Sequence, residues 1–146
     1  MSEPVVFGAA YSVYVRAVRL ALAEKGVAYR LEPVDVFGQG GPPAEHLARH
    51  PFGKIPAFDH EGFTLYETGA ITRYVDEAFA GPALQPAAPT ARARMNQAIS
   101  ILDHYVYPIL VWGIYVERVV APLAGRAPDE DKIAHALPRA WACLDA

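Results

Sequence analysis

Pro51-Phe52-Gly53-Lys54-Ile55-Pro56-Ala57, with Glu67-Thr68 shortly after it, is the stretch of sequence that decides the fold of this chain. An Ile-Pro step beside a short strand presents the backbone of Ile55 edge-on to a ligand, in the manner of an added strand. Glu67 and Thr68, at a predicted strand-to-helix junction, offer a carboxylate, a hydroxyl and the N–H groups of a helix end. Together the two segments are suited to hold both ends of a small peptide.

The composition is that of a globular protein. The chain has 146 residues, enough for one core or for one compact domain with part of a second. A hydrophobic content of 53% and a charged content of 20% exclude a disordered chain. The net charge is −3 and the lysines and arginines are scattered, so the sequence lacks the basic footprint of a nucleic-acid-binding protein.

Signals for secretion, disulfide formation and membrane insertion are not found in the sequence. Met1-Ser2-Glu3-Pro4 has neither the basic nor the apolar region of a secretory signal, so we expect a cytoplasmic protein. Cys143 is the only cysteine, which excludes an internal disulfide and a cysteine-based metal cluster. The most apolar run, Tyr105 to Val116, is too short to span a bilayer, and no membrane association is expected.

Two other patterns are interpreted as carrying no ligand. His46, His60 and His135 lack metal-ligand spacing, so we interpret them as surface residues and predict no metal site. Gly38-Gln39-Gly40-Gly41 follows a predicted strand but lacks the lysine-serine pair of a phosphate-binding loop. Nucleotide binding is therefore not expected.

Residues 1–80 alternate predicted strands and helices. Apolar spacing and turn residues mark each element. The predicted elements are a strand at 5–7, a helix at 12–25 stopped by Gly26, a strand at 29–36, a short helix at 44–49, strands at 56–59 and 63–66, and a helix at 69–79. The predicted order is βαβαββα.

Residues 81–89 contain three prolines and no periodicity, which is typical of a linker between two domains, 1–80 and 90–146. From Thr90 the pattern is helical, and Pro108 is expected to bend the first helix. A second helix is predicted to begin near Asp129, where acidic residues suit the helix dipole. The sequence reaches Ala146 without a helix stop signal. We therefore expect an incomplete helical domain.

Three segments occur in an order that resembles the soluble glutathione transferases. They are residues 11–27, His50-Pro51-Phe52-Gly53-Lys54-Ile55-Pro56, and Leu65-Tyr66-Glu67-Thr68-Gly69-Ala70-Ile71. The resemblance covers nearly the whole chain. It implies an α/β plus all-α protein, with a thioredoxin-like βαβαββα domain followed by part of a helical bundle. It also implies a cytoplasmic homodimer that conjugates glutathione to small apolar electrophiles in detoxification.

The resemblance assigns catalysis to Ser12, which stands where phi-, theta- and zeta-like members place a serine at the start of the first helix. A thiol with a pKa of about 8.5 is only a few per cent thiolate at neutral pH, so the enzyme must stabilise the anion. The Ser12 hydroxyl and the N–H groups of the helix are expected to do so. Tyr11 and Tyr14 remain rival hydroxyl donors, and a role for Ser12 as an N-cap alone also stays open.

The resemblance also implies a glutathione site made of Lys54, Ile55, Pro56, Glu67 and Thr68. The backbone of Ile55 would bond to the cysteinyl unit, next to a cis peptide bond to Pro56. Glu67 and Thr68 would hold the ammonium and the carboxylate of the γ-glutamyl unit. Lys54 would contact the glycyl carboxylate, although it stands in place of a common glutamine and Thr68 in place of a commoner serine.

The second substrate is expected to contact aromatic residues. The candidates for an electrophile pocket are Tyr11, Tyr14, Tyr107, Trp112 and Tyr115, with core or dimer packing as the alternative for each. A non-catalytic binding or assembly module is a second possible function, because fold does not settle activity. A specialised glutathione-dependent isomerase, dehalogenase or peroxidase is a third.

Overall fold

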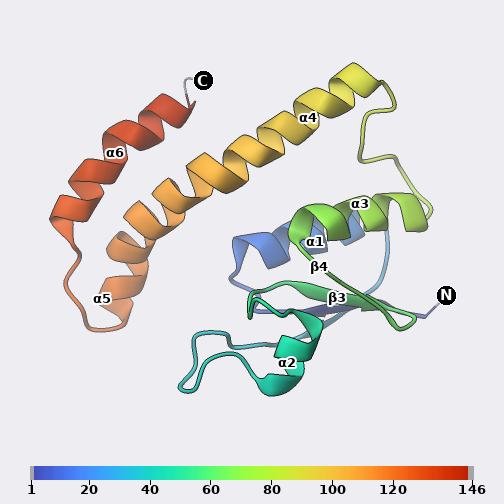
Figure 1. The fold of residues 1–146 in the computed structure, drawn as a ribbon, viewed down its shortest axis with the longest axis horizontal. Coiled ribbons are helices and arrows are strands. Elements are labelled where there is room, and N and C mark those ends of the chain that lie inside the picture. The colour runs from blue at the N-terminus through green and yellow to red at the C-terminus, as the bar shows by residue number, and fades with distance from the viewer. Residues whose placement is uncertain (1, 145–146) are drawn as a thin grey trace. The chain divides into compact units, whose positions relative to one another are not determined.

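The computed structural model describes residues 2–144. The chain divides into two compact units, Met1–Pro86 and Ala87–Ala146. The first unit contains a mixed sheet with three helices, whereas the elements described in the second are all helical (Figure 1). The predicted combination of an α/β part and an all-α part is therefore confirmed.

The first unit has the predicted βαβαββα order. Its elements are β1 (Val5–Phe7), α1 (Val13–Glu24), β2 (Arg30–Glu32), α2 (Ala44–Arg49), β3 (Ala57–His60), β4 (Phe63–Tyr66) and α3 (Thr68–Ala78). The strand order in the sheet is β2-β1-β3-β4. Strands β1 and β2 are parallel, whereas β3 runs antiparallel to both β1 and β4. This arrangement confirms the thioredoxin-like fold.

The core of the first unit lies between the sheet and two helices. Helices α1 and α3 pack side by side on one face of the sheet, and α2 lies on the other face (Figure 1). Val15, Val18 and Leu22 of α1 meet Ile71 and Val75 of α3, and all five are 0% exposed. Full burial of such a side chain contributes about 1.5–3 kcal/mol. This packing holds α1 and α3 against the sheet, and so holds the N-termini of both helices in place beside the strands.

Prolines set the limits of two strands. Strand β2 ends at Glu32, so the strand predicted at 29–36 is wrong in its length. Pro33 follows directly, and a proline has no N–H with which to continue the pairing. Strand β3 begins at Ala57 for the same reason, since Pro56 cannot donate.

A buried ion pair ties residues 82–85 to the rest of the first unit. Lys25 Nζ lies 3.0 Å from Asp76 Oδ1, and these side chains are 3% and 7% exposed. The ammonium also donates to the carbonyl of Pro82 at 3.0 Å. The Asp76 carboxylate accepts from Leu84 N at 2.8 Å and from Gln85 N at 3.1 Å. Part of the segment predicted as a linker is thus held against α1 and α3.

The second unit is built from a bent helix followed by a second helix. Its elements are α4 (Pro89–Ile101), the π-helical segments η1 (Leu102–Val106) and η2 (Pro108–Val120), α5 (Ala121–Leu123) and α6 (Glu130–Leu144). Pro89–Val106 and Pro108–Leu123 meet at a bend of 44°, which confirms the bend predicted at Pro108. Within residues 2–144, no single helix is long and apolar enough to cross a bilayer. Those two segments meet the criteria of length and composition only as a bent pair.

Helices η2 and α6 approach closely at Gly113. A Cβ atom on Gly113 would lie 2.9 Å from the Cβ of Ala136, closer than two such atoms normally come. Ile109, Ala136 and Ala140 form a small buried cluster beside this contact. The absence of a side chain on Gly113 therefore permits the packing of the two helices.

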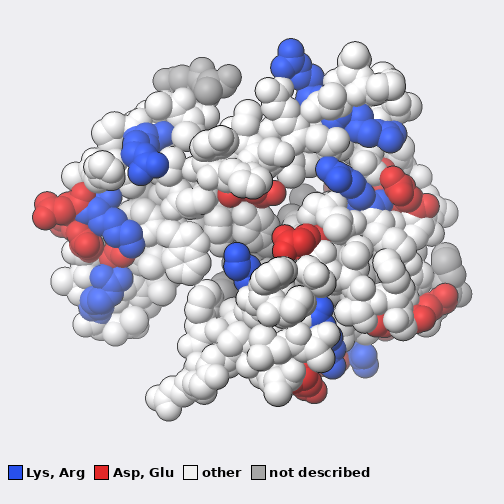
Figure 2. All heavy atoms as spheres, in the orientation of Figure 1, with Lys and Arg blue, Asp and Glu red and all other residues white. Residues whose placement is uncertain are grey.

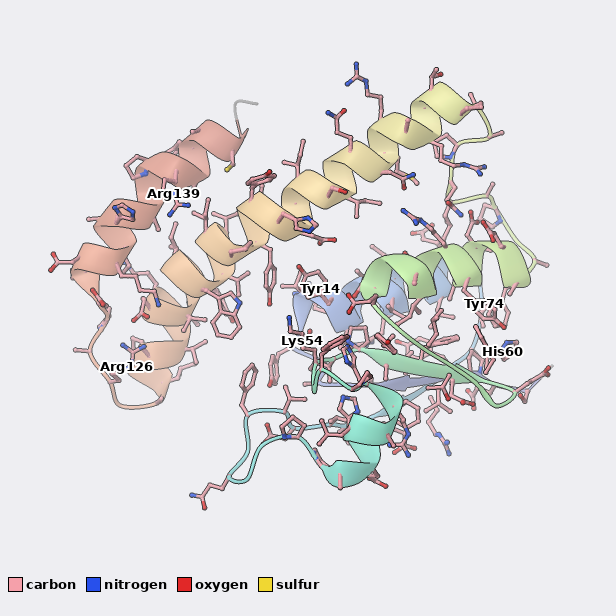
Figure 3. The ribbon with its side chains drawn as sticks, in the orientation of Figure 1. Tyr14, Lys54, His60, Tyr74, Arg126 and Arg139 are labelled. Carbon is pink, nitrogen blue, oxygen red and sulfur yellow. The ribbon has the colours of Figure 1, made fainter. Side chains whose placement is uncertain are left out.

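Glu117 of η2 is buried and joins this helix to the start of α6. Its carboxylate accepts from Arg126 at 2.9 Å, from Lys132 Nζ at 2.8 Å and from Asp129 N at 3.3 Å. The bonds from Arg126 and Lys132 lower the pKa of Glu117 to about 2. Figure 3 shows Arg126 between α5 and α6.

Acidic and basic side chains are interspersed on the visible face of each unit (Figure 2).

Candidate functional site

Three connections of the first unit meet at one end of its strands. The register pairs Phe7 with Ala57 and Ala57 with Tyr66. The chain leaves β1 after Phe7 toward α1, enters β3 through Ile55-Pro56, and leaves β4 after Tyr66 into α3. Two helix N-termini therefore begin beside the Ile55-Pro56 segment. Their N–H groups make this end of the sheet attractive to anions.

Ser12 is the N-cap of α1. Its Oγ accepts from Val15 N at 3.4 Å, which is a long hydrogen bond. A serine hydroxyl has a proton to donate in addition to its lone pairs, so capping leaves that proton available to an anion at the helix start. Tyr11 is 65% exposed, and Tyr14 is half-buried on the first turn of α1 (Figure 3).

Ile55 lies against the junction of β1 and α1. A Cβ atom on Gly8 would lie 2.5 Å from Val15 Cγ2 and 3.3 Å from Ile55 Cβ. Gly8 is thus the point where α1 and the Ile55 segment come together, and only a residue without a side chain fits there. The Ile55–Pro56 peptide bond is cis, as the resemblance implies.

Glu67 adopts a backbone conformation that residues other than glycine rarely use. Its φ is 71° and its ψ is 116°, at the N-cap position of α3. Within residues 2–144, no side chain caps this helix. Its carbonyl accepts from Ala70 N and Ile71 N, each at 3.0 Å, whereas its side chain is exposed. Thr68 is the first helical residue. Backbone strain of this kind, about 1–3 kcal/mol, is concentrated at functional sites.

Lys54 and Glu67 both act on a buried imidazole, His50. Burial is the main cause that lowers the pKa of His50, the carboxylate of Glu67 opposes this shift, and His46 and Lys54 add to it. The His50 ring lies 4.8 Å from the ring of Tyr66, between centroids. The side chains proposed for the two ends of a peptide lie on the segments before β3 and after β4, which meet at the same end of the strands.

The prediction of surface histidines is wrong for two of the three. His46 and His60 are 1% and 5% exposed, whereas His135 is exposed. His46 Nε2 lies 2.7 Å from the Lys54 carbonyl oxygen, and His60 Nδ1 lies 2.9 Å from the Tyr74 hydroxyl. Helix α2 has six residues, too few for a periodic pattern to mark which face is buried. No group of three or more metal-binding side chains gathers within residues 2–144.

The aromatic residues predicted for the electrophile pocket belong to both units. Tyr11 and Tyr14 lie in the first unit, and Tyr107, Trp112 and Tyr115 lie in the second. Trp112 and Tyr115 are 45% and 52% exposed on η2. Tyr107 is half-buried, and burial raises the pKa of its hydroxyl. Their participation in one pocket stays a prediction.

Comparison with known proteins gives a consistent set of relatives. A family model described as the N-terminal domain of glutathione S-transferase matches residues 6–83. Glutathione S-transferase 4 of Zea mays is 36% identical over 121 residues, which cover 83% of this chain and 54% of the relative. The maleylacetoacetate isomerase of Rhizobium meliloti (strain 1021) is 38% identical over 104 residues, which cover 71% of this chain and 48% of the relative.

Solved structures of glutathione S-transferases share the fold of this chain. The structure of glutathione S-transferase III in apo form superposes with a TM-score of 0.83 and 30% sequence identity, covering 99% of this chain and 67% of the other. The chain spans about half the length of the two relatives matched by sequence. Because the family model matches more than half of its 146 residues, this chain belongs to the glutathione S-transferase family.

Proposed function

We propose that the first unit binds glutathione at the end of the strands described above, and that the chain conjugates the glutathione thiolate to small apolar electrophiles. The observation that carries this proposal is the register of Phe7, Ala57 and Tyr66. That register gathers the start of α1, the Ile55-Pro56 segment and the start of α3 in one place. Membership of the family supports the same activity.

The tripeptide would lie along the Ile55-Pro56 segment. The backbone of Ile55 pairs with the cysteinyl unit in strand-addition fashion. The exposed carboxylate of Glu67 receives the ammonium of the γ-glutamyl unit, and Thr68 with the N-terminus of α3 receives its carboxylate. Lys54, exposed and adjacent to Ile55, pairs with the glycyl carboxylate. Pro56 fixes the end of the segment where β3 begins.

This geometry would place the thiol near the start of α1. A hydrogen bond from the Ser12 hydroxyl and the positive end of the helix dipole both favour the anion. Lowering the thiol pKa by one unit needs only about 1.4 kcal/mol and raises the thiolate fraction at neutral pH about tenfold.

The acceptor and the assembly complete the proposal. Tyr11, Tyr14, Tyr107, Trp112 and Tyr115 provide aromatic surface suited to an apolar electrophile. We propose a cytoplasmic homodimer, since both properties are implied by the resemblance to soluble glutathione transferases.

The test measures three properties of the unaltered protein and of Ser12→Ala. They are glutathione binding by calorimetry, the pH dependence of the ultraviolet absorbance of the bound thiolate, and conjugation of a generic aryl halide. In Ser12→Ala the pKa of the bound thiol is expected to rise by about one unit, and the rate at neutral pH to fall about tenfold. Ser100→Ala, an exposed serine of α4, is the matched control and should change neither.

Equal thiol pKa values and rates in Ser12→Ala and the unaltered protein would remove Ser12 from the mechanism. Tyr11→Phe and Tyr14→Phe would then be compared in the same assays. Glutathione binding without conjugation of any electrophile would favour a non-catalytic binding module.

Glutathione-dependent isomerisation is a second candidate function. The 38% identity to a maleylacetoacetate isomerase favours it. The two candidates share the glutathione site and differ in the second substrate. Rates with maleylacetoacetate and with an aryl halide, each measured with saturating glutathione, distinguish them.

A further inference from the structure

His46 is a buried polar side chain that contacts the segment proposed to bind glutathione. It lies in α2, is 1% exposed, and places its Nε2 at 2.7 Å from the Lys54 carbonyl oxygen. Because a carbonyl oxygen only accepts hydrogen bonds, Nε2 carries a proton and donates it. The other ring nitrogen, Nδ1, has no hydrogen-bond partner within residues 2–144. Among the described residues, the His46 ring therefore makes one hydrogen bond, to the Lys54 carbonyl oxygen.

That bond closes a short loop between α2 and β3. His50 N donates to the His46 carbonyl at 2.8 Å, and Gly53 N donates to the His50 carbonyl at 2.9 Å. Gly53 has a φ of 61°, and a Cβ atom there would lie 2.7 Å from Pro42 Cγ. The loop is thus packed closely up to Gly53, and His46 fixes the peptide group that precedes Ile55.

The orientation of this peptide group decides what Ile55 offers to a ligand. The Lys54 carbonyl and the Ile55 N–H belong to one planar trans unit, so they point in opposite directions. Since His46 holds the carbonyl toward its buried ring, the Ile55 N–H is directed away from that ring. No group within residues 2–144 accepts a hydrogen bond from this N–H. A peptide that pairs with the segment as an added strand needs such a donor.

We infer that His46 is a positioning residue for glutathione, whose Nε2–H orients the Lys54–Ile55 peptide so that the Ile55 N–H faces the cysteinyl unit. The inference rests on the proposed function. His46 acts through Lys54 and contacts neither the tripeptide nor Ser12. It is therefore expected to change the affinity for glutathione and not the chemical step.

The test compares three variants of the full chain: His46→Leu, His46→Gln and His60→Leu. Glutamine carries an N–H donor at about the reach of Nε2, whereas leucine carries none. His46→Leu is expected to raise the KM and Kd for glutathione about tenfold, which is about 1.4 kcal/mol, with little change in kcat. His46→Gln should recover most of the affinity.

His60→Leu is the matched control. His60 is also buried, bonds through one ring nitrogen to Tyr74, and lies at the other end of β3 from Lys54 (Figure 3). Its replacement should lower the Tm and leave the Kd for glutathione unchanged.

The possible outcomes separate this inference from the proposed function. If His46→Leu binds glutathione as tightly as the unaltered protein and only its Tm falls, the ring is merely structural and the inference is overturned. If His46→Leu does not fold, His46→Gln is compared with His46→Asn, whose amide stops short of the Lys54 carbonyl. Weaker binding by the asparagine variant supports the inference, and equal binding overturns it. If the unaltered protein binds no glutathione, the proposed function fails first and the inference fails with it.

Discussion

Two glutamates of the first unit share a strained backbone and differ in their surroundings. Glu67 has a φ of 71° at the start of α3, beside the proposed ligand, and Glu61 has a φ of 55° in the hairpin between β3 and β4. Positive φ costs residues other than glycine about 1–2 kcal/mol. In the hairpin the strain serves a turn, whereas at Glu67 it places a carboxylate at a helix N-terminus.

Glycine at position 67 is expected to separate stability from binding. Glu67→Gly should raise the free energy of unfolding by about 1 kcal/mol, because relief of strain outweighs the entropy that glycine loses on folding. It should weaken glutathione binding about tenfold or more, because a hydrogen bond to a charged group, about 1.5–3 kcal/mol, is lost. Denaturant unfolding and calorimetry measure the two effects. Glu61→Gly should reproduce the stability gain with unchanged affinity, and the same affinity in Glu67→Gly would show that its carboxylate does not bind the tripeptide.

The sequence predicts at this scale the residues whose role follows from local chemistry. Cap preference marks Ser12 and the Ile-Pro step marks Ile55, whereas Glu67 is predicted from its place between a strand and a helix and from the family resemblance. His46 escapes such reasoning because its partner is a backbone carbonyl, which every residue has. Only the fold reveals which carbonyl lies within reach, and so the buried ring was predicted to be a surface residue.

At the scale of elements, the contact between η2 and α6 depends on one missing methyl group. Gly113→Ala would place a Cβ atom 2.9 Å from Ala136 Cβ. Overpacking of this kind costs about 1–3 kcal/mol, so the free energy of unfolding should fall by that amount. Thermal and denaturant unfolding followed by circular dichroism provide the measurement.

Gly69→Ala is the matched control for that substitution. Gly69 is also helical, in α3, and no atom lies within 4 Å of the position its Cβ would take. Alanine there should stabilise the protein by up to about 1 kcal/mol through helix propensity. If Gly113→Ala were as stable as Gly69→Ala, the close packing of η2 on α6 would be disproved.

The helix starts at Ser12 and near Asp129 could be predicted because capping and acidic residues act locally. Asp129 Oδ1 accepts from Lys132 N at 2.9 Å, just where the acidic run predicts a helix start. The packing of Gly113 on Ala136 could not be predicted, since the two residues are far apart in the sequence. The strand predicted at 29–36 is too long because Val34 and Val36 have side chains typical of strands, whereas Pro33 ends the pairing after Glu32.

At the scale of the whole molecule, the Lys25–Asp76 pair joins residues 82–85 to the rest of the first unit. The pKa of Asp76 is lowered from 3.8 to about 2. The hydrogen bond from Leu84 N is the main cause, and the bonds from Lys25 and Gln85 also contribute. The folded state therefore holds this proton less tightly than the unfolded state. The stability this provides is complete above about pH 4 and is lost as the pH falls through about 2.

Asp76→Asn is expected to remove part of the acid sensitivity of the fold. At neutral pH it should cost about 3 kcal/mol or more, because the buried Lys25 ammonium loses its counter-charge. Between pH 4 and 2 its stability should fall less steeply than that of the unaltered protein. Acid unfolding curves measure both effects. Asp35→Asn, which removes an exposed carboxylate of the same unit, is the control. If the stability of Asp76→Asn fell with pH as steeply as that of the unaltered protein, Asp76 would not be a source of the acid sensitivity.

The same ion pair has a consequence for how such proteins recombine. A gene fusion that exchanged the chain directly after Ala80 would replace the segment whose conformation brings Pro82 O, Leu84 N and Gln85 N to the Lys25–Asp76 pair. A junction after Gln85 would carry the whole set. The unit that can be exchanged as a whole therefore extends beyond α3, and functional chimaeras are expected to have crossover points after Gln85.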